Sequence, residues 1–230
     1  MPNWVTNKIK TSSAVIAAIV NDKGVIDFNL AAPFPGPRGA DWDGIYGDAE
    51  TAANAVLGIP VSAHPLIAML ESANRKQTDI KKLSDASFSQ FIGMLENHRA
   101  CGYLHSMDWQ RSKWGTKWNA CDPEYDIAAG TAQFDTAWSC PEALFKVLSE
   151  QFPEDEITVT YADEDIGSNC GSFVLKAGQV THSEIAPPWS RMTDDDKSKW
   201  RHFAYQVKGY STEEIAEREA EIAEDRNNAA

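Results

Sequence analysis

Four tryptophans lie close together in the middle of this chain. They are Trp109, Trp114, Trp118 and Trp138. A tryptophan ring is large and apolar, and its indole N–H needs a partner when it is buried. Such density therefore indicates either the packed centre of a sheet or a recognition surface. The 230 residues can bury a full core and form one large domain or two small ones.

The net charge of −13 is concentrated in one segment. Residues 122–168 contain twelve acidic side chains and a single basic one, Lys146. This segment would repel phosphates, which disfavours direct nucleic-acid binding, and it would attract a basic protein surface. The alternative is that the charge serves solubility alone. The predicted partner-binding residues are Asp122, Glu124, Asp126, Glu154, Asp155, Glu156, Asp163, Glu164 and Asp165.

No apolar run approaches the roughly 20 residues that a membrane helix needs, so we expect no membrane association. The first residues lack the basic-then-apolar pattern of a secretory leader, and we expect a cytoplasmic protein. The four cysteines are scattered without a C-x-x-C pair, which predicts reduced and mostly buried thiols.

The first forty residues predict two strands around a helix. Side chains alternate over residues 3–11, and Ser12 or Ser13 can cap a short helix over 14–20. Residues 25–30 are typical of a second strand. Residues 33–39, rich in proline and glycine, then interrupt regular structure.

Residues 40–113 predict a helical insertion. Residues 49–57 and 65–72 are compatible with helices, and Gly102 ends a third. The third helix has an apolar stripe at helical spacing, formed by Phe88, Phe91, Ile92 and Leu95.

Strands return after the insertion. Phe134, Thr136 and Trp138 share one face of a third strand, and residues 157–161 alternate as a fourth. Between them, Ser139-Cys140-Pro141-Glu142 matches the sequence pattern of a capping box at the start of a helix. Residues 172–175 and 179–185 predict a hairpin, and two helices follow. The first begins at Thr193-Asp194-Asp195-Asp196, which resembles a capping box, and the second is capped at Ser211.

This order of elements predicts an α+β fold in which a split βαβ, ferredoxin-like arrangement forms a mostly antiparallel sheet. The predicted domains are a ferredoxin-like domain over residues 1–39 and 114–188, the helical insertion over 40–113, and a C-terminal helical extension over 189–230. The last helix is highly polar, which makes it a candidate contact for a homo-oligomer.

Three segments carry a resemblance to a known family. They are Met1-Pro2-Asn3-Trp4, Trp114-Gly115-Thr116-Lys117-Trp118-Asn119, and Phe134-Asp135-Thr136-Ala137-Trp138-Ser139. Together they resemble the YubB-like family of uncharacterised phage and plasmid proteins with a ferredoxin-like domain. The resemblance implies an accessory protein of a mobile genetic element. It implies no reaction, no cofactor and no catalytic residue.

Several residues are candidates for ligand binding, metal binding or catalysis. Trp114, Lys117, Trp118, Asn119 and Trp138 form the predicted ligand-binding set, because indoles and an ammonium can hold a flat or anionic ligand. The alternative is that the indoles fill the core. Three weaker patterns are Cys101 with His105 and Cys121 as metal ligands, Cys140 as a thiolate at a helix start, and Asp163-Glu164-Asp165 as a cation loop. No common catalytic motif is present, and we expect no metal.

Two functions follow as hypotheses. The first is a non-enzymatic, acidic interaction protein of phage or plasmid origin that acts in the host cytoplasm. It would bind or inhibit a host nucleic-acid-handling or defence factor through that factor's basic surface. The second is a small-ligand or nucleotide-binding protein, or an enzyme, that uses the tryptophan set.

Overall fold

The computed structural model describes residues 2–39 and 44–229, and only the backbone of residues 223–229. Met1, at the start of one quoted segment, and residues 40–43, at the start of the predicted insertion, lie outside the described residues. The chain divides into two compact units. We call Met1–Pro33 with Ser112–Ala230 the sheet unit, and Phe34–Arg111 the helical unit.

The sheet unit contains six strands in the order β2-β3-β1-β4-β5-β6. Every neighbouring pair is antiparallel. The strands are β1 (Trp4–Lys10), β2 (Cys121–Asp126), β3 (Thr131–Ala137), β4 (Glu156–Asp163), β5 (Cys170–Lys176) and β6 (Gln179–Ile185).

Two split βαβ motifs interleave in this sheet. Strand β3 lies between β1 and β2, and β1 lies between β3 and β4. Helix α1 (Ser13–Ile19) follows β1, and helix α6 (Glu142–Gln151) joins β3 to β4. This is the ferredoxin-like arrangement. The predicted α+β fold class is therefore confirmed, and β5 and β6 extend the sheet as a hairpin.

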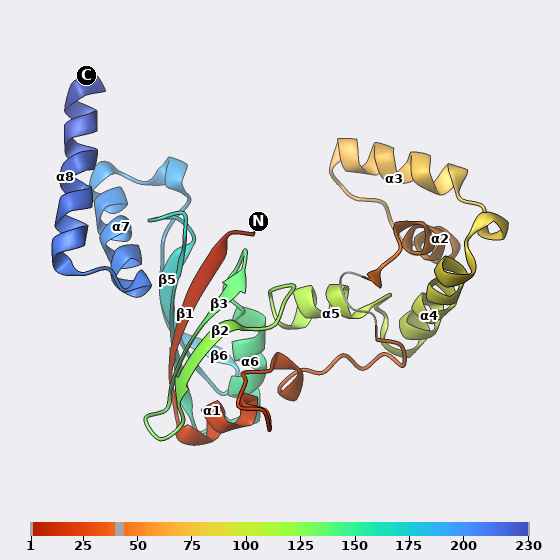
Figure 1. The fold of residues 1–230 in the computed structure, drawn as a ribbon, viewed down its shortest axis with the longest axis horizontal. Helices are drawn as coiled ribbons and strands as arrows, with labels where there is room; N and C mark the ends of the chain where they lie inside the picture. The colour runs from red at the N-terminus through yellow and green to blue at the C-terminus, as the bar shows by residue number, and fades with distance from the viewer. Residues whose placement is uncertain (1, 40–43, 230) are drawn as a thin grey trace. The chain divides into compact units, whose positions relative to one another are not determined.

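The main core lies between one face of the sheet and helices α1 and α6 (Figure 1). The helices contribute a stripe of fully buried side chains: Val15, Ile16, Ile19, Leu144, Phe145 and Leu148. Alternate residues of the strands meet them, among them Val5, Ile9, Phe134, Ile157 and Val159. Alternation in the strands and helical spacing in the helices therefore point to one shared interior.

Helix α7 (Asp194–Lys208) packs on the opposite face of the sheet, against Ala162 and Cys170. The predicted capping box is present, because Thr193 and Asp196 bond each other's backbone N–H groups. After the short turn at Gly209, α8 (Thr212–Ala229) is attached to α7 by Arg201 and Glu219, whose nearest atoms are 2.7 Å apart. A short 3-10 helix, Trp189–Arg191, precedes α7.

The helical unit consists of α2 (Gly47–Leu57), α3 (Pro65–Gln77), a 3-10 turn (Ile80–Lys82), α4 (Asp85–Cys101) and most of α5 (Ser106–Lys113). Alanines of α2, Ala49, Ala52 and Ala53, cluster with Phe91 and Met94 of α4. Small side chains let the two helices approach closely. Gly102 ends α4 in the left-handed conformation, as the sequence predicts.

The prediction of a second strand over residues 25–30 is wrong. Ile26 forms only an isolated bridge with Val20. Phe28–Leu30 form a 3-10 turn, which the Asp27 side chain caps. The actual second strand, β2, follows the helical unit. It contains Pro123 and three acidic side chains, which suit an edge strand although they have low strand propensity.

The predicted capping box at Ser139 is also wrong. Helix α6 begins at Glu142, and its N-cap is Pro141 without a side-chain cap. The Ser139 hydroxyl donates to the carbonyl of Gly115 at 2.5 Å instead. A tertiary hydrogen bond has therefore replaced the local one.

None of the described helices has the length and apolar character that crossing a bilayer requires.

Trp114 is predicted to be a main contributor to the stability of the sheet unit. Its ring is 1% exposed, packs edge-on against Phe28, and donates from Nε1 to the Ala32 carbonyl at 2.8 Å. Trp114→Phe should lower the free energy of unfolding by about 2–3 kcal/mol, because it leaves a cavity and removes the indole hydrogen bond. Urea denaturation measures this loss. The same change at Trp138, which is 51% exposed, should cost less than about 0.5 kcal/mol, and equal losses would contradict the assignment.

Candidate functional site

Aromatic and basic side chains gather at the end of the sheet where β1 begins and β3 ends. The Lys117 ammonium lies 4.1 Å from the ring centroid of Trp118 and 5.9 Å from that of Trp138. Trp118 packs against Trp4 with a centroid distance of 6.0 Å. We call Trp4, Lys117, Trp118 and Trp138 the tryptophan–lysine surface. A cation held against indole faces shows that these rings can bind positive charge.

Trp138 is held in an unusual conformation. Its φ is 71°, in the left-handed region that costs a residue with a side chain about 1–2 kcal/mol. Its N–H donates to the Asn3 carbonyl at 2.9 Å, and its own carbonyl accepts from the Asn169 amide at 3.3 Å. The surrounding structure therefore imposes a strained backbone on a half-exposed indole, a combination that points to a functional role.

Asp163 supports the backbone conformation of Trp138 through two asparagines. The residue is 4% exposed. Its carboxylate accepts hydrogen bonds from Asn169 at 2.8 Å, from the amide N–H of Asp165 at 3.0 Å and from Asn3 at 3.4 Å. Asp163 therefore orders the two asparagines that hold Trp138, and it does not present its charge to a partner.

The structure separates two members of the predicted ligand-binding set from the other three. Trp114 is buried in the main core. Asn119 accepts from the Phe28 N–H at 2.9 Å and donates to Asp27 at 2.8 Å, so it orders the 27–30 turn. Lys117, Trp118 and Trp138 remain together at the end of the sheet.

The predicted acidic residues do not form one continuous face. Glu154, Asp155 and Glu156 lie at the beginning of β4, whereas Glu164 and Asp165 follow its end. At the usual rise per residue the nearest members, Glu156 and Glu164, are separated by roughly 26 Å. Glu164 and Asp165 are exposed and stand at the same end of the sheet as the tryptophan–lysine surface.

The three acidic residues of the edge strand β2 have a mixed environment. Glu124 and Asp126 lie with Lys8 and Lys10 around a shallow cavity of ≈ 570 Å³ on the open sheet face. These lysines offset part of the negative charge. Asp122 lies at the opposite end of β2, toward the tryptophan–lysine surface, and has a positive φ of 46° at a register irregularity.

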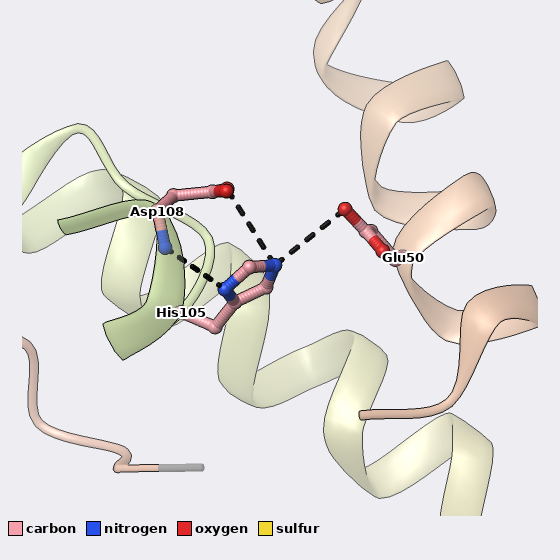
Figure 2. Close-up of side chains that lie close together, drawn as sticks. All are labelled: Glu50, His105 and Asp108. Carbon is pink, nitrogen blue, oxygen red and sulfur yellow. Dashed lines mark hydrogen bonds and ion pairs between the residues drawn. The ribbon is translucent and has the colours of Figure 1, made fainter. Parts of the chain in front are cut away.

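A second constellation occurs in the helical unit, where Figure 2 shows the His105 ring between two carboxylates. The His105 Nε2 atom is 3.5 Å from Oε1 of Glu50 in α2 and 3.5 Å from Oδ2 of Asp108 in α5. The imidazole is 1% exposed, and the carboxylates are 36% and 38% exposed. His105 precedes the first residue of α5, and its Nδ1 accepts the Asp108 N–H at 3.4 Å, as a helix cap would.

The two carboxylates of this cluster differ in acidity. The hydrogen bond from His105 lowers the pKa of Glu50 despite partial burial. Burial raises the pKa of Asp108, and His105 offsets this only in part. The positive charge of Arg111 lowers both pKa values. A cavity of ≈ 530 Å³ beside α4 also includes His105 in its wall.

The sequence pointed to His105 but to the wrong partners. The Cys101 thiol contacts the Asn97 carbonyl at 3.3 Å, and Cys121 belongs to the sheet unit. The spacing of His105 and Asp108, one helical turn apart, is a local signal that these two side chains meet. Glu50 is far away in sequence and had no local signal.

The remaining thiols are held in their neutral form. Burial raises the pKa of Cys140 well above its ordinary value, and the nearby Glu142 adds to this. Burial also raises the pKa of Cys170 to about 12, and that of Cys121 above its usual range. The predicted helix-start thiolate at Cys140 is therefore not supported.

Comparisons with known proteins bear on the sheet unit. Residues 113–204 match the family model of the ferredoxin-like domain in Api92-like protein. This segment spans β2 to β6 and most of α7, and it holds a ferredoxin-like domain similar to that family's. Strand β1 lies outside the matched residues and pairs with β3 and β4 in the same sheet. A crystal structure of protein api92 from Yersinia pseudotuberculosis is similar at 11% identity and a TM-score of 0.38, over 82% of this chain and 100% of that chain. No curated protein matches the chain.

The strain at Trp138 can be measured directly. Glycine adopts the left-handed conformation freely, so Trp138→Gly should unfold with a free energy about 1 kcal/mol higher than Trp138→Ala, although glycine normally destabilises relative to alanine. Urea denaturation of the two variants tests this. If the alanine variant were the more stable, the imposed conformation would be refuted. The same pair at Ser172 in β5 serves as a control, where alanine should be favoured.

Proposed function

We propose that the protein is a non-enzymatic binding protein that docks the basic surface of another protein on the end of the sheet carrying the tryptophan–lysine surface. The observation that carries this proposal is the half-exposed Trp138, held in a strained backbone at the end of the sheet where Glu164 and Asp165 are exposed. Aromatic residues of this kind dominate the binding energy of many interfaces.

Two exposed carboxylates at this end of the sheet suit a cationic partner group. Glu164 and Asp165 lie on the loop that follows β4, whose Glu164 N–H donates to the Trp4 carbonyl at 3.0 Å. Asn169, at the far end of this loop, bonds to Trp138. The loop is therefore tied to the tryptophan–lysine surface at two points. An arginine or lysine side chain could meet an indole face and a carboxylate together.

Electrostatics at longer range act in the same direction. Asp122 and Asp135 lie near enough to Cys121 to raise the pKa of its thiol, and both are at this end of the sheet. The net charge of −13 would speed the approach of a basic protein. Proteins that handle nucleic acid carry cationic grooves, so the partner we propose is a host nucleic-acid-handling or defence factor. On this proposal a phage or plasmid encodes the protein, and it acts in the host cytoplasm.

A labelled basic peptide tests this proposal. Fluorescence anisotropy of an arginine-rich peptide at low ionic strength should report binding by the full chain. Trp138→Ala should weaken binding about tenfold, because an aromatic anchor contributes roughly 1–2 kcal/mol. Replacing Glu164 by Gln and Asp165 by Asn together should weaken it severalfold, and this effect should shrink as salt is added.

A matched control distinguishes docking at this end of the sheet from general attraction to an acidic protein. The changes Glu154→Gln and Asp155→Asn remove the same charge at the opposite end of β4 and should leave peptide affinity unchanged. Equal losses from the two double variants would refute a localised docking site. Absence of peptide binding at low salt would refute the proposal as a whole.

A second candidate function has its own supporting observation. The Lys117 ammonium lies 4.1 Å from the Trp118 ring centroid and 5.9 Å from that of Trp138. A flat anion could stack on an indole there and pair with the ammonium. This candidate is a small-ligand or nucleotide-binding protein.

Thermal-shift measurements with nucleoside monophosphates and aromatic carboxylates test the second candidate. At least one compound should raise the unfolding temperature of the wild type, by mass action on the folded state. Lys117→Met should abolish the rise. Lys10→Met, which changes a lysine at the opposite end of β1, should preserve it. No shift with any compound would count against this candidate.

A further inference from the structure

We propose that Glu50, His105 and Asp108 bind a divalent transition-metal cation of the Zn²⁺ or Mn²⁺ class. Figure 2 shows the three side chains converging from α2 and from the start of α5. Each offers one ligand atom, and the three atoms lie within 4.8 Å of one another. This site is independent of partner docking at the sheet unit.

The spacing of the three atoms is close to what a bound cation requires. A Zn²⁺ ion lies about 2.0–2.2 Å from imidazole nitrogen and carboxylate oxygen, so its ligand atoms are separated by roughly 3–3.5 Å. Nε2 of His105 is already 3.5 Å from each carboxylate oxygen. Small rotations of Glu50 and Asp108, both partly exposed, would complete the geometry.

The ligands stand on rigid elements. Glu50 follows Ala49, which packs in the α2–α4 core at 0% exposure. His105 follows Leu104 of the same core, and Asp108 lies one helical turn further along. The imidazole is sealed from solvent, whereas the carboxylates reach the surface. Water could therefore occupy the remaining coordination positions, as in sites with three protein ligands.

The donor set decides the class of cation. One imidazole nitrogen with two carboxylate oxygens suits Zn²⁺ or Mn²⁺, whereas Ca²⁺ prefers oxygen ligands alone and Cu⁺ prefers sulfur. Two carboxylates near the positive charge of Arg111 also carry negative charge that a dication would neutralise.

The ring proton has to move when the cation binds. In the cation-free arrangement Nδ1 accepts the Asp108 N–H, so the proton lies on Nε2 and faces the carboxylates. Binding through Nε2 transfers this proton to Nδ1 and gives up the long 3.4 Å contact with the amide. The metal–ligand bonds replace it, and they join α2 to α5.

Calorimetric titration of the tag-free, EDTA-treated full chain with ZnCl₂ and with MnCl₂ tests the proposal. We expect one cation per chain and a higher unfolding temperature in its presence. Glu50→Gln and Asp108→Asn should each weaken binding at least about tenfold, since even outer contacts of metal ligands matter by that factor. Both side chains are partly exposed, so the variants should fold, which circular dichroism verifies.

Two further variants make the outcome decisive. Glu96→Gln removes the same charge in the same unit, from a carboxylate paired with Arg38, and should bind the cation as the wild type does. Arg111→Gln removes the nearby positive charge and should tighten binding severalfold. Absence of one-to-one binding to the wild type would overturn the proposal. Equal affinities of the wild type, Glu50→Gln and Asp108→Asn would also overturn it.

Discussion

The position of β1 between β3 and β4 is the constraint on which the sheet unit depends. Strand β1 pairs along its length with two strands that lie more than a hundred residues later in the chain. The chain must therefore return to its starting point after the whole helical unit. Trp114 fixes this return, because its indole N–H bonds the Ala32 carbonyl just before the chain leaves the sheet unit. This buried aromatic contact, together with the β1 pairings, offsets part of the loop-closure entropy of the long segment.

The sequence predicted the elements whose patterns are local. Alternating side chains located β1, β4 and the β5–β6 hairpin, and the capping box at Thr193 located α7. The hairpin turn, with positive φ at Ala177 and Gly178, also matches its prediction. The ferredoxin-like order followed from these elements even though one strand was placed wrongly.

The errors occurred where a distant contact overrules a local preference. Strand β2 contains proline and acidic residues, and it forms because β3 offers it a sheet edge. Ser139 has a good capping context, yet its hydroxyl bonds Gly115 in another loop. Neither partner can be recognised from the residues nearby in the chain.

The candidate sites show the same division. The sequence identified Lys117, Trp118 and Trp138 because they are close in the chain, but it grouped them with Trp114 and Asn119, which are structural. It read the acidic residues as one surface, whereas the length of β4 separates them into two groups. Asp163 has its charge directed inward, toward the asparagines that hold Trp138. Glu50 meets His105 only because α2 folds back onto α4.

The hydrogen bond between Trp114 and Ala32 has a consequence for how such a chain can change. It brings together the two points where the polypeptide leaves and re-enters the sheet unit, so the intervening segment is anchored to the sheet unit at both of its ends. The length and sequence of this segment could therefore vary without shifting the register of any strand, because domain insertion is tolerated where the two chain connections lie close together. The sheet unit therefore serves as a framework, and the sequence of the inserted helices can change independently of it.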